Sequence, residues 1–253
     1  MTPILHSHIP HDMSEVRLPG VAPLDPDDWL IRDEVFAAQM ALRDELIATR
    51  RDAVVALTAA GEAAAAELLS LVLSHLARDD GYRIRAESVL RPDGVEVPLD
   101  WRDPMGTVGR LVQQDMCLME KASGAAEHVM TGAVLCFPAG WTLSEKMGRP
   151  LIRIHKPVAS YDDDLARRVQ RLFDGVRDGR PLWRFNALGY VDPALFQPRR
   201  EGVEKYGTPE EQRYLRSERQ SILRLPDSGA VVFGIHTYVV RKPDQDPAQK
   251  KLR

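Results

Sequence analysis

Two strand-forming segments near the C-terminal end of the sequence constrain the fold most strongly. Residues 216–225 and 230–240 are rich in apolar and β-branched side chains, and the turn sequence Pro226-Asp-Ser-Gly229 separates them. Two such segments around a short turn predict an antiparallel β-hairpin. The chain must therefore build a fold that contains at least this antiparallel strand pair.

The order of the other elements indicates the fold class. Helical composition or periodicity is found in residues 29–57, 62–77, 104–121 and 161–176. Further strands are predicted at residues 82–97, 129–137 and 182–190. Helices come first, and strands mixed with helices follow up to the hairpin, which favours an α+β protein with an antiparallel sheet flanked by helices over a doubly wound parallel sheet. The Gly-rich motifs of nucleotide-binding folds are absent from the sequence.

Three parts of the chain differ in composition. Residues 1–28 are rich in Pro, His and Asp, which predicts an extended N-terminal arm. Its histidines, at positions 6, 8 and 11, are interpreted as adventitious metal ligands at most, because the segment has no core of its own. Residues 29–241 are expected to form a single domain. Residues 197–215 within it are polar and predict a long connection, for which a lid is one interpretation. Residues 242–253 are expected to form a polar C-terminal tail.

Charge, hydropathy and cysteine usage exclude several protein classes. A net charge of -3 gives no reason to expect a nucleic-acid partner. No apolar run is judged long enough to cross a membrane, and the N-terminus lacks a secretion signal. The two cysteines, Cys117 and Cys136, are typical of a reduced, cytoplasmic protein. The motif Cys-x-x-Cys-His is absent, which excludes covalent c-type haem.

One stretch, Cys136 to Val158, combines residue types that suit a site more than a core. It contains Trp141, a Ser-Glu-Lys triplet, a Gly-Arg-Pro turn and His155. Pro157 disfavours helix before it, so a helix here should end near His155. A histidine at a helix end presents a ring nitrogen to a metal or ligand. The alternative is a partly buried histidine that is bonded to a backbone carbonyl.

Polar groups also gather in Leu182-Trp-Arg-Phe-Asn186 and Arg216-Ser-Glu-Arg-Gln220. Strand alternation places Ser217 and Arg219 on one face, with Glu218 and Gln220 on the other. Surface ion pairing is the ordinary role of such a run, and a pocket is the alternative. Asp115 shares a predicted helix face with apolar residues, which favours a buried arginine partner over a catalytic role.

Taken in order, these motifs resemble the haem-dependent oxidative N-demethylase family, from about residue 20 to residue 241. The segments Gly109–Lys121 and Leu143–Pro150 also carry the resemblance. It implies a PAS-like antiparallel sheet around a non-covalent haem b, with a histidine on the iron. It also implies a monooxygenase-type oxidoreductase that removes an N-methyl group from a small amine with O2 and releases formaldehyde. Electrons would come from NADPH through a separate flavin and iron–sulfur reductase partner.

The resemblance assigns roles to individual residues. His155 matches the family's histidine motif and is the expected iron ligand. Arg219 and Glu218 match positions of the Arg-Ser-Glu-Arg-Gln motif and are the expected catalytic residues. Their roles are inferred from chemistry and not from the match: Arg219 as a hydrogen-bond donor to oxygen or a propionate, and Glu218 as a partner for the amine or its proton. The expected cofactor-binding residues are Trp141, Lys146, Arg149, Arg153, Trp183, Arg184 and Asn186, with the three cations near His155 as propionate partners.

Several alternatives stay open at this point. Ala187 stands where family members often have a second aromatic residue, so the identity of the amine is open. His236 competes with His155 as the iron ligand, and a Cys136 thiolate is a weaker candidate. A haem-based sensor and a member that has lost haem are the competing functions. Two cysteines are too few for a Cys-ligated cluster, so electrons must come from another chain.

Overall fold

The computed structural model describes residues 2–11, 20–155, 163–204 and 206–242, with the backbone alone at residues 155 and 163–166. A seven-stranded sheet runs through these residues in the order β1-β8-β9-β10-β6-β7-β2. Its strands are β1 (Ala22–Pro23), β2 (Val55–Leu57), β6 (Asp115–Glu120), β7 (Val129–Val134), β8 (Leu182–Tyr190), β9 (Tyr214–Arg224) and β10 (Val231–Arg241). Every neighbouring pair is antiparallel, and the α+β prediction is confirmed.

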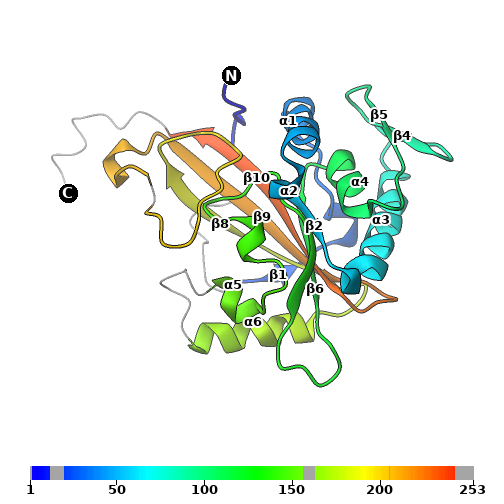
Figure 1. Ribbon diagram of the computed structural model, residues 1–253. Coiled ribbons are helices and arrows are strands. Elements are labelled where there is room, and N and C mark those ends of the chain that lie inside the picture. The colour runs from blue at the N-terminus through cyan, green and yellow to red at the C-terminus, as the bar shows by residue number, and fades with distance from the viewer. Residues whose placement is uncertain (1, 12–19, 156–162, 205, 243–253) are drawn as a thin grey trace.

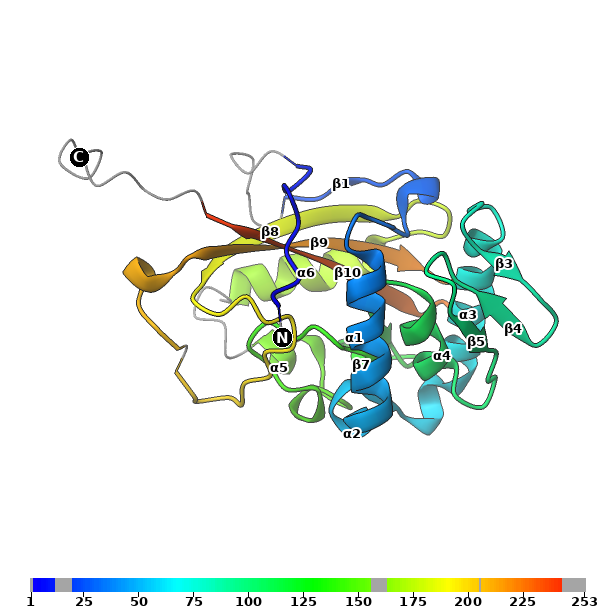
Figure 2. The ribbon, with the colours of Figure 1, turned by 90° about the horizontal axis from the view of Figure 1, so that it is seen from above.

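The predicted C-terminal hairpin is present and lies inside the sheet. β9 and β10 pair along their whole lengths, from Val231 opposite Arg224 to Arg241 opposite Tyr214. β8 extends the hairpin on one side and β6 on the other. A second, three-stranded sheet is formed by β3 (Arg83–Ile84), β4 (Ser88–Leu90) and β5 (Glu96–Pro98). Figure 2 shows β8, β9 and β10 side by side, with the N-terminal segment crossing them.

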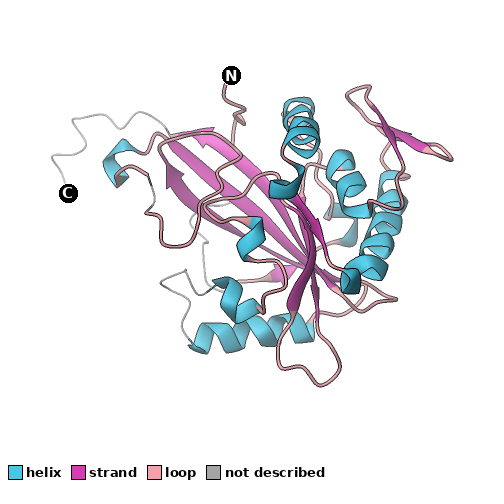
Figure 3. Cartoon of the chain, viewed as in Figure 1, coloured by secondary structure: helices cyan, strands magenta, loops and turns pink. Residues whose placement is uncertain are grey.

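Helices cover the two faces of the large sheet in two groups (Figures 1 and 3). The first group is α1 (Phe36–Thr49), α2 (Arg51–Val54), α3 (Glu62–Leu76) and α4 (Pro104–Leu111). These helices share an apolar core with Met116, Leu118 and Val232, and this side is called the α3 face. The second group is α5 (Leu151–His155) and α6 (Asp163–Gly175), which pack with Cys117 and Val231 on the α6 face. Single turns of 3₁₀ helix are η2 (Pro26–Asp28), η3 (Ala59–Gly61), η4 (Leu143–Glu145) and η5 (Pro209–Glu211).

Two predicted helices are shorter in the structure than the sequence suggested. The helix expected over residues 104–121 ends at Leu111, and residues 115–120 form β6 instead. β6 is an internal strand whose residues 115–119 are all buried, and a continuous apolar run does not distinguish such a strand from a buried helix. The segment 29–57 likewise ends in the short strand β2 and not in helix.

The expectation about apolar runs needs a correction. Residues 59–76, which comprise η3 and α3, are long and apolar enough to cross a membrane by length and composition. In the structure, Leu68, Leu69 and Val72 are fully buried in the shared core on the α3 face. A core helix of a globular protein meets the same length and composition test, and the packing of α3 is that of a core helix.

Candidate functional site

The polar motifs on β8 and β9 are divided between the two faces of the sheet. Arg184 lies opposite Gln220 in the strand register, and Asn186 lies opposite Glu218. All four side chains are on the α6 face, whereas Arg219 is on the α3 face. The predicted alternation along residues 217–220 is therefore confirmed. It follows that the two expected catalytic residues, Glu218 and Arg219, point away from each other.

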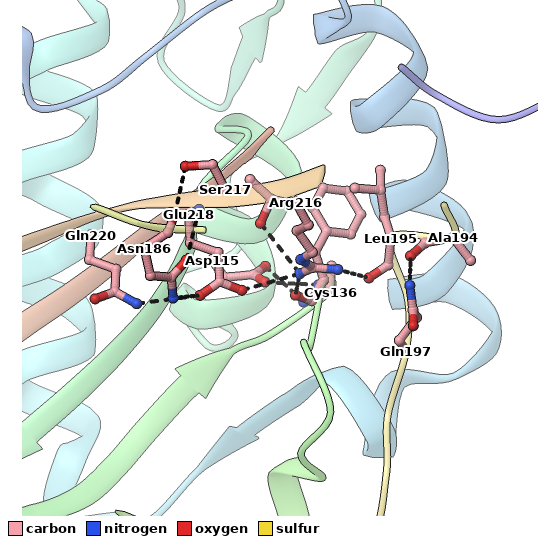
Figure 4. Close-up of polar contacts among 12 residues, drawn as sticks. Asp115, Cys136, Asn186, Ala194, Leu195, Gln197, Arg216, Ser217, Glu218 and Gln220 are labelled. Atoms are coloured by element: carbon pink, nitrogen blue, oxygen red, sulfur yellow. Dashed lines mark hydrogen bonds and ion pairs between the residues drawn. The ribbon is translucent and has the colours of Figure 1, made fainter. Parts of the chain in front are cut away.

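On the α6 face, five side chains form a connected network, which we call the β8–β9 polar cluster: Arg184, Asn186, Arg216, Glu218 and Gln220. Glu218 is at its centre, 9% exposed. Its Oε2 accepts hydrogen bonds from Asn186 Nδ2 at 3.0 Å and Gln220 Nε2 at 3.3 Å, and its Oε1 lies 3.5 Å from Arg216 Nη2. Arg184 Nη1 donates to Gln220 Oε1 at 3.2 Å. The carboxylate is thus held in one orientation before any ligand arrives (Figure 4).

Arg216 connects this cluster to the chain segments at the edge of the site. Its Nη1 donates to the carbonyl oxygen of Leu195 at 3.0 Å, and its Nη2 donates to the carbonyl oxygen of Phe137. Leu195 belongs to the connection between β8 and β9 (Figure 4), and Phe137 follows β7 in the sequence. A single buried guanidinium therefore fixes the position of Glu218 relative to the segment that carries Trp141.

Asp115 supports the same segment by binding its backbone N–H groups. Its Oδ1 accepts from Arg43 Nη1 at 2.6 Å and from the backbone N–H of Cys136 at 2.8 Å, and its Oδ2 accepts from the N–H of Phe137 at 2.8 Å. Arg43 and Asp115 are both fully buried. The prediction of a buried arginine partner for Asp115 is confirmed, although the residue lies on a strand and not on a helix.

Arg184 provides a buried donor on the α6 face. Its Nε makes no hydrogen bond with any of the described residues. Burial lowers the pKa of its guanidinium, an effect that the nearby Glu218 opposes. Because a buried donor without a partner is costly, this N–H is available to an acceptor on a bound molecule.

α5 brings the expected iron ligand to the same side of the sheet. The described part of α5 runs to His155, and the helix end expected from Pro157 stays a prediction because residues 156–162 lie outside the described residues. Leu151 belongs to the same apolar cluster as Ile222 on the α6 face. The side chain of His155 lies outside the described residues. Trp141 is partly buried in the same apolar cluster. The part of this stretch from Trp141 to Ile154 therefore lies on the α6 face, as does the β8–β9 polar cluster, whereas Cys136 and Phe137 pack in the core on the α3 face.

The three cations expected near His155 have different environments. Lys146 Nζ donates to Glu201 Oε1 at 2.8 Å, and Arg153 donates to both carboxylate oxygens of Glu201 at 2.9 Å. Hydrogen bonds from Arg153 and Lys146 lower the pKa of Glu201 to about 2. Arg149 is exposed. Two of the three cations expected to bind propionates are thus paired with a carboxylate of the protein itself, and no local pattern in the sequence indicates this pairing.

Arg219 and Trp183 are placed together on the α3 face. The Arg219 guanidinium lies 5.3 Å from the centre of the Trp183 ring, and its Nη2 donates to the carbonyl oxygen of Asp28 at 3.0 Å. His11 packs on Phe185, with ring centres 4.2 Å apart, and its Nε2 is 2.9 Å from Ser217 Oγ. The structure therefore does not bring Arg219 and Trp183 together with Glu218, Arg184 and Asn186.

A histidine–aspartate cluster on the α3 face was missed in the sequence. Oδ2 of Asp33 lies 2.8 Å from Nε2 of both His6 and His236. The hydrogen bonds from these histidines outweigh burial and hold the pKa of Asp33 well below its usual range. Burial lowers the pKa of His236, which the bond to Asp33 opposes. The three residues are 27 and 203 positions apart, so no local spacing could have revealed them.

The donor pattern of this cluster matches a hydrogen-bonded clasp more closely than a metal site. Two histidines and a carboxylate have the composition of a metal centre, and their ligand atoms lie within 4.8 Å of one another. However, the backbone N–H of Val239 donates to Nδ1 of His6 at 3.2 Å, which places the ring proton on Nε2, facing Asp33. A protonated Nε2 has no lone pair for a metal. His236, the competing iron ligand, is bonded here and lies on the face opposite α5.

Neither the cysteines nor the surface hollows offer a better site. Burial raises the pKa of the Cys136 thiol to about 12, which opposes a thiolate ligand. One hollow of about 300 Å³ lies between α1 and α4, and another of about 310 Å³ lies between α3 and η2. Both are lined by elements of the α3 side of the molecule. The α6 face remains the place where polar groups, apolar walls and the end of α5 meet.

The structure defines an α+β protein with a large antiparallel sheet, one face of which carries a cluster of buried polar side chains. The family model described as haem-dependent oxidative N-demethylase, alpha subunit-like, matches residues 20–248. The chain belongs to this family. The match covers all seven strands of the large sheet and both groups of helices, so it applies to the whole fold and not to a single motif.

Proposed function

We propose that this protein is a haem-dependent oxidoreductase subunit that removes an N-methyl group from a small amine by oxidation with O2, releasing formaldehyde. The observation that supports this most directly is the buried Glu218 carboxylate, held by Asn186, Gln220 and Arg216 on the same face as the helix that ends at His155. Residues 29–241 would form one haem-binding unit that works in the cytoplasm, with residues 1–28 as an arm and 242–253 as a tail.

The residues on the α6 face fit the chemistry of haem. A haem needs apolar walls for its ring, hydrogen-bond donors or cations for its propionates and a neutral nitrogen for its iron. Leu143, Leu151, Phe173 and Val176 are buried on this face, and Trp141 and Ile154 are partly buried beside them. His155 would supply the iron ligand, and the unpaired Nε of Arg184 would bind a propionate. The strand order β7-β6-β10-β9-β8, with α5 and α6 on one face, supports a PAS-like assignment.

When bound, haem supplies the redox chemistry with oxygen, and the protein supplies binding and orientation. Glu218 would bind the protonated amine through a charge-assisted hydrogen bond at Oε1, while Asn186 and Gln220 keep Oε2 in place. The same Oε1 would then accept the amine proton, since a free lone pair on nitrogen is needed for oxidation. Arg219 lies on the opposite face, so we assign no catalytic contact to it.

The electron balance requires a second protein. Converting R–NH–CH3 and O2 to R–NH2, formaldehyde and water takes up two electrons and two protons from outside. The two cysteines are both buried and cannot ligate an iron–sulfur cluster by themselves. We therefore propose that NADPH supplies the electrons through a separate flavin and iron–sulfur reductase, in keeping with the description of the family as alpha subunit-like.

The test begins with the purified protein. We expect a Soret band from one haem per chain, which acid–acetone extraction removes because the haem is not covalently attached. His155→Ala should lose haem or shift the Soret band, and added imidazole should partly restore it. His236→Ala, on the opposite face, is the matched control and should keep the wild-type spectrum.

Turnover is measured as formaldehyde produced with reductant, O2 and a series of small methylamines. Protein that takes up no haem would overturn the proposal. Protein that binds haem but produces no formaldehyde from any of the amines would support a sensor instead. A spectrum lost in His236→Ala but kept in His155→Ala would assign the iron ligand to the other face of the sheet.

A further inference from the structure

An ion-pair network joins the last turn of α5 to two other segments, and we call it the Glu201 clamp. Besides its bonds from Lys146 and Arg153, the Glu201 backbone N–H donates to Glu145 Oε2 at 3.1 Å. Lys146 Nζ also donates to the carbonyl oxygen of Ile154 at 2.9 Å. The clamp therefore connects the residues around η4, the connection between β8 and β9, and α5.

The clamp acts at the end of a helix that has little stability of its own. α5 has five residues, far fewer than an isolated helix needs. The last carbonyl groups of a helix lack partners within the helix, and a cation near them is favourable. Lys146 satisfies the Ile154 carbonyl, and its side chain is only 4% exposed. Arg153 is the residue before Ile154, and its guanidinium is held by two parallel hydrogen bonds to Glu201.

We propose that Glu201 is a positioning residue for the iron ligand: by fixing Lys146 and Arg153, it sets the orientation of the last turn of α5 and so the direction in which His155 presents its ring. This inference rests on the proposed function, because it takes His155 as the ligand. Groups that orient a metal-ligating histidine commonly change metal affinity by about 10–100-fold when they are removed. The β8–β9 connection would thus contribute to haem binding through Glu201 without touching the haem.

The same contacts allow a second interpretation, which predicts the opposite effect of removing Glu201 on haem affinity. If Lys146 and Arg153 bind the haem propionates, Glu201 competes with haem for them, and its removal should tighten binding. If Glu201 positions α5, its removal should weaken binding. Glu201→Gln keeps the size of the side chain and removes its charge, so it distinguishes the two. Glu204→Gln is the matched control, since Glu204 is an exposed residue of the same connection.

The experiment uses the full chain in two states. In haem-loaded protein, transfer of haem to apomyoglobin measures the dissociation rate, and resonance Raman spectroscopy measures the iron–histidine stretching frequency. In haem-free protein, hydrogen exchange measures the protection of the amides of residues 151–155. We expect Glu201→Gln to release haem about tenfold faster than wild type, which is within the range for groups that orient a ligating histidine. We also expect a shifted iron–histidine stretching frequency and faster hydrogen exchange of the α5 amides in this variant. Glu204→Gln should match wild type throughout.

Each other result contradicts the inference. Slower haem release in Glu201→Gln would show competition with a propionate. Unchanged release and frequency would show that Glu201 has no role toward the ligand, even if α5 exchanges faster. Wild-type protein that takes up no haem would refute the proposed function and, with it, the role toward the ligand. The exchange of α5 in the haem-free variant would then show by itself whether Glu201 orders the helix.

Discussion

Replacement of Asp115 by Asn should destabilise the protein severely while leaving its shape almost unchanged. The carboxylate accepts three hydrogen bonds, from Arg43 and from the backbone N–H groups of Cys136 and Phe137. An asparagine offers one oxygen, and its NH2 group would face one of these donors. The fully buried Arg43 would also lose the charge that balances it.

The expected loss is about 3–5 kcal/mol in the free energy of unfolding, the cost of removing one partner of a buried ion pair. This is a large part of the 5–15 kcal/mol, roughly, that stabilises a typical domain. Guanidinium denaturation at equilibrium, followed by circular dichroism, measures it. Arg43→Met, added to Asp115→Asn, removes the second buried charge. The loss of unfolding free energy in the double variant should therefore be smaller than the sum of the losses in the two single variants.

The matched control is Glu96→Gln, which breaks the Arg85–Glu96 pair on the surface, where both side chains are about half exposed. It should cost far less than Asp115→Asn, because solvent screens an exposed ion pair. If Asp115→Asn loses no more stability than this control, burial does not set the strength of the Arg43–Asp115 pair. Additive losses in the double variant would show that the two side chains are not energetically coupled.

Two further predictions concern the two faces of the sheet. Glu218→Gln should raise KM for the amine by about 10–100-fold, because a hydrogen bond to a charged group contributes about 1.5–3 kcal/mol. Arg219→Gln, one residue away on the other face, should leave KM unchanged. Equal effects of the two variants on KM would contradict the placement of Glu218 and Arg219 on opposite faces of the sheet. Burial, with smaller contributions from Arg219 and His236, lowers the pKa of His11 to about 4. Unfolded protein therefore binds a proton at this residue that folded protein does not, and stability is fully present above pH 6.5 and falls as the pH drops from 6.5 towards 4. With allowance for the partial exposure of His11, the free energy of unfolding should fall by about 1 kcal/mol between pH 7 and pH 5. The urea midpoints at these two pH values should therefore differ less in His11→Gln than in wild type. Equal differences would show that His11 does not titrate in this way.

The parts of the fold that the sequence predicted are those set by local pattern. The hairpin of β9 and β10 follows from two apolar segments around one turn, and the alternation along residues 217–220 follows from the period of a strand. β6 was predicted as helix because a strand buried on both faces has no alternation to reveal it. The helix expected before Pro157 is present as α5, because the apolar and charged residues before the proline favour a helix there.

The site was predicted as a set of motifs but not as an arrangement in space. Glu218 and Asn186 were recognised separately, and the register of β8 and β9, which no local pattern reports, brings them together. Glu201 was missed because its partners are 48 and 55 residues away, and Asp33 because one of its partners is 203 residues away. Lys146 and Arg153 were noticed, but a partner within the protein could not be inferred from cations alone.

The position of β10 has a consequence for how the chain folds during synthesis. β10 follows the other strands of the described residues in the sequence, and it lies between β9 and β6 in the middle of the sheet. A nascent chain therefore carries two partial sheets, β2-β7-β6 and β1-β8-β9, whose inner edges are unpaired until residues 231–241 leave the ribosome. Exposed strand edges favour association between chains. We expect truncations before residue 231 to aggregate, and the nascent chain to depend on chaperones until β10 joins the two partial sheets.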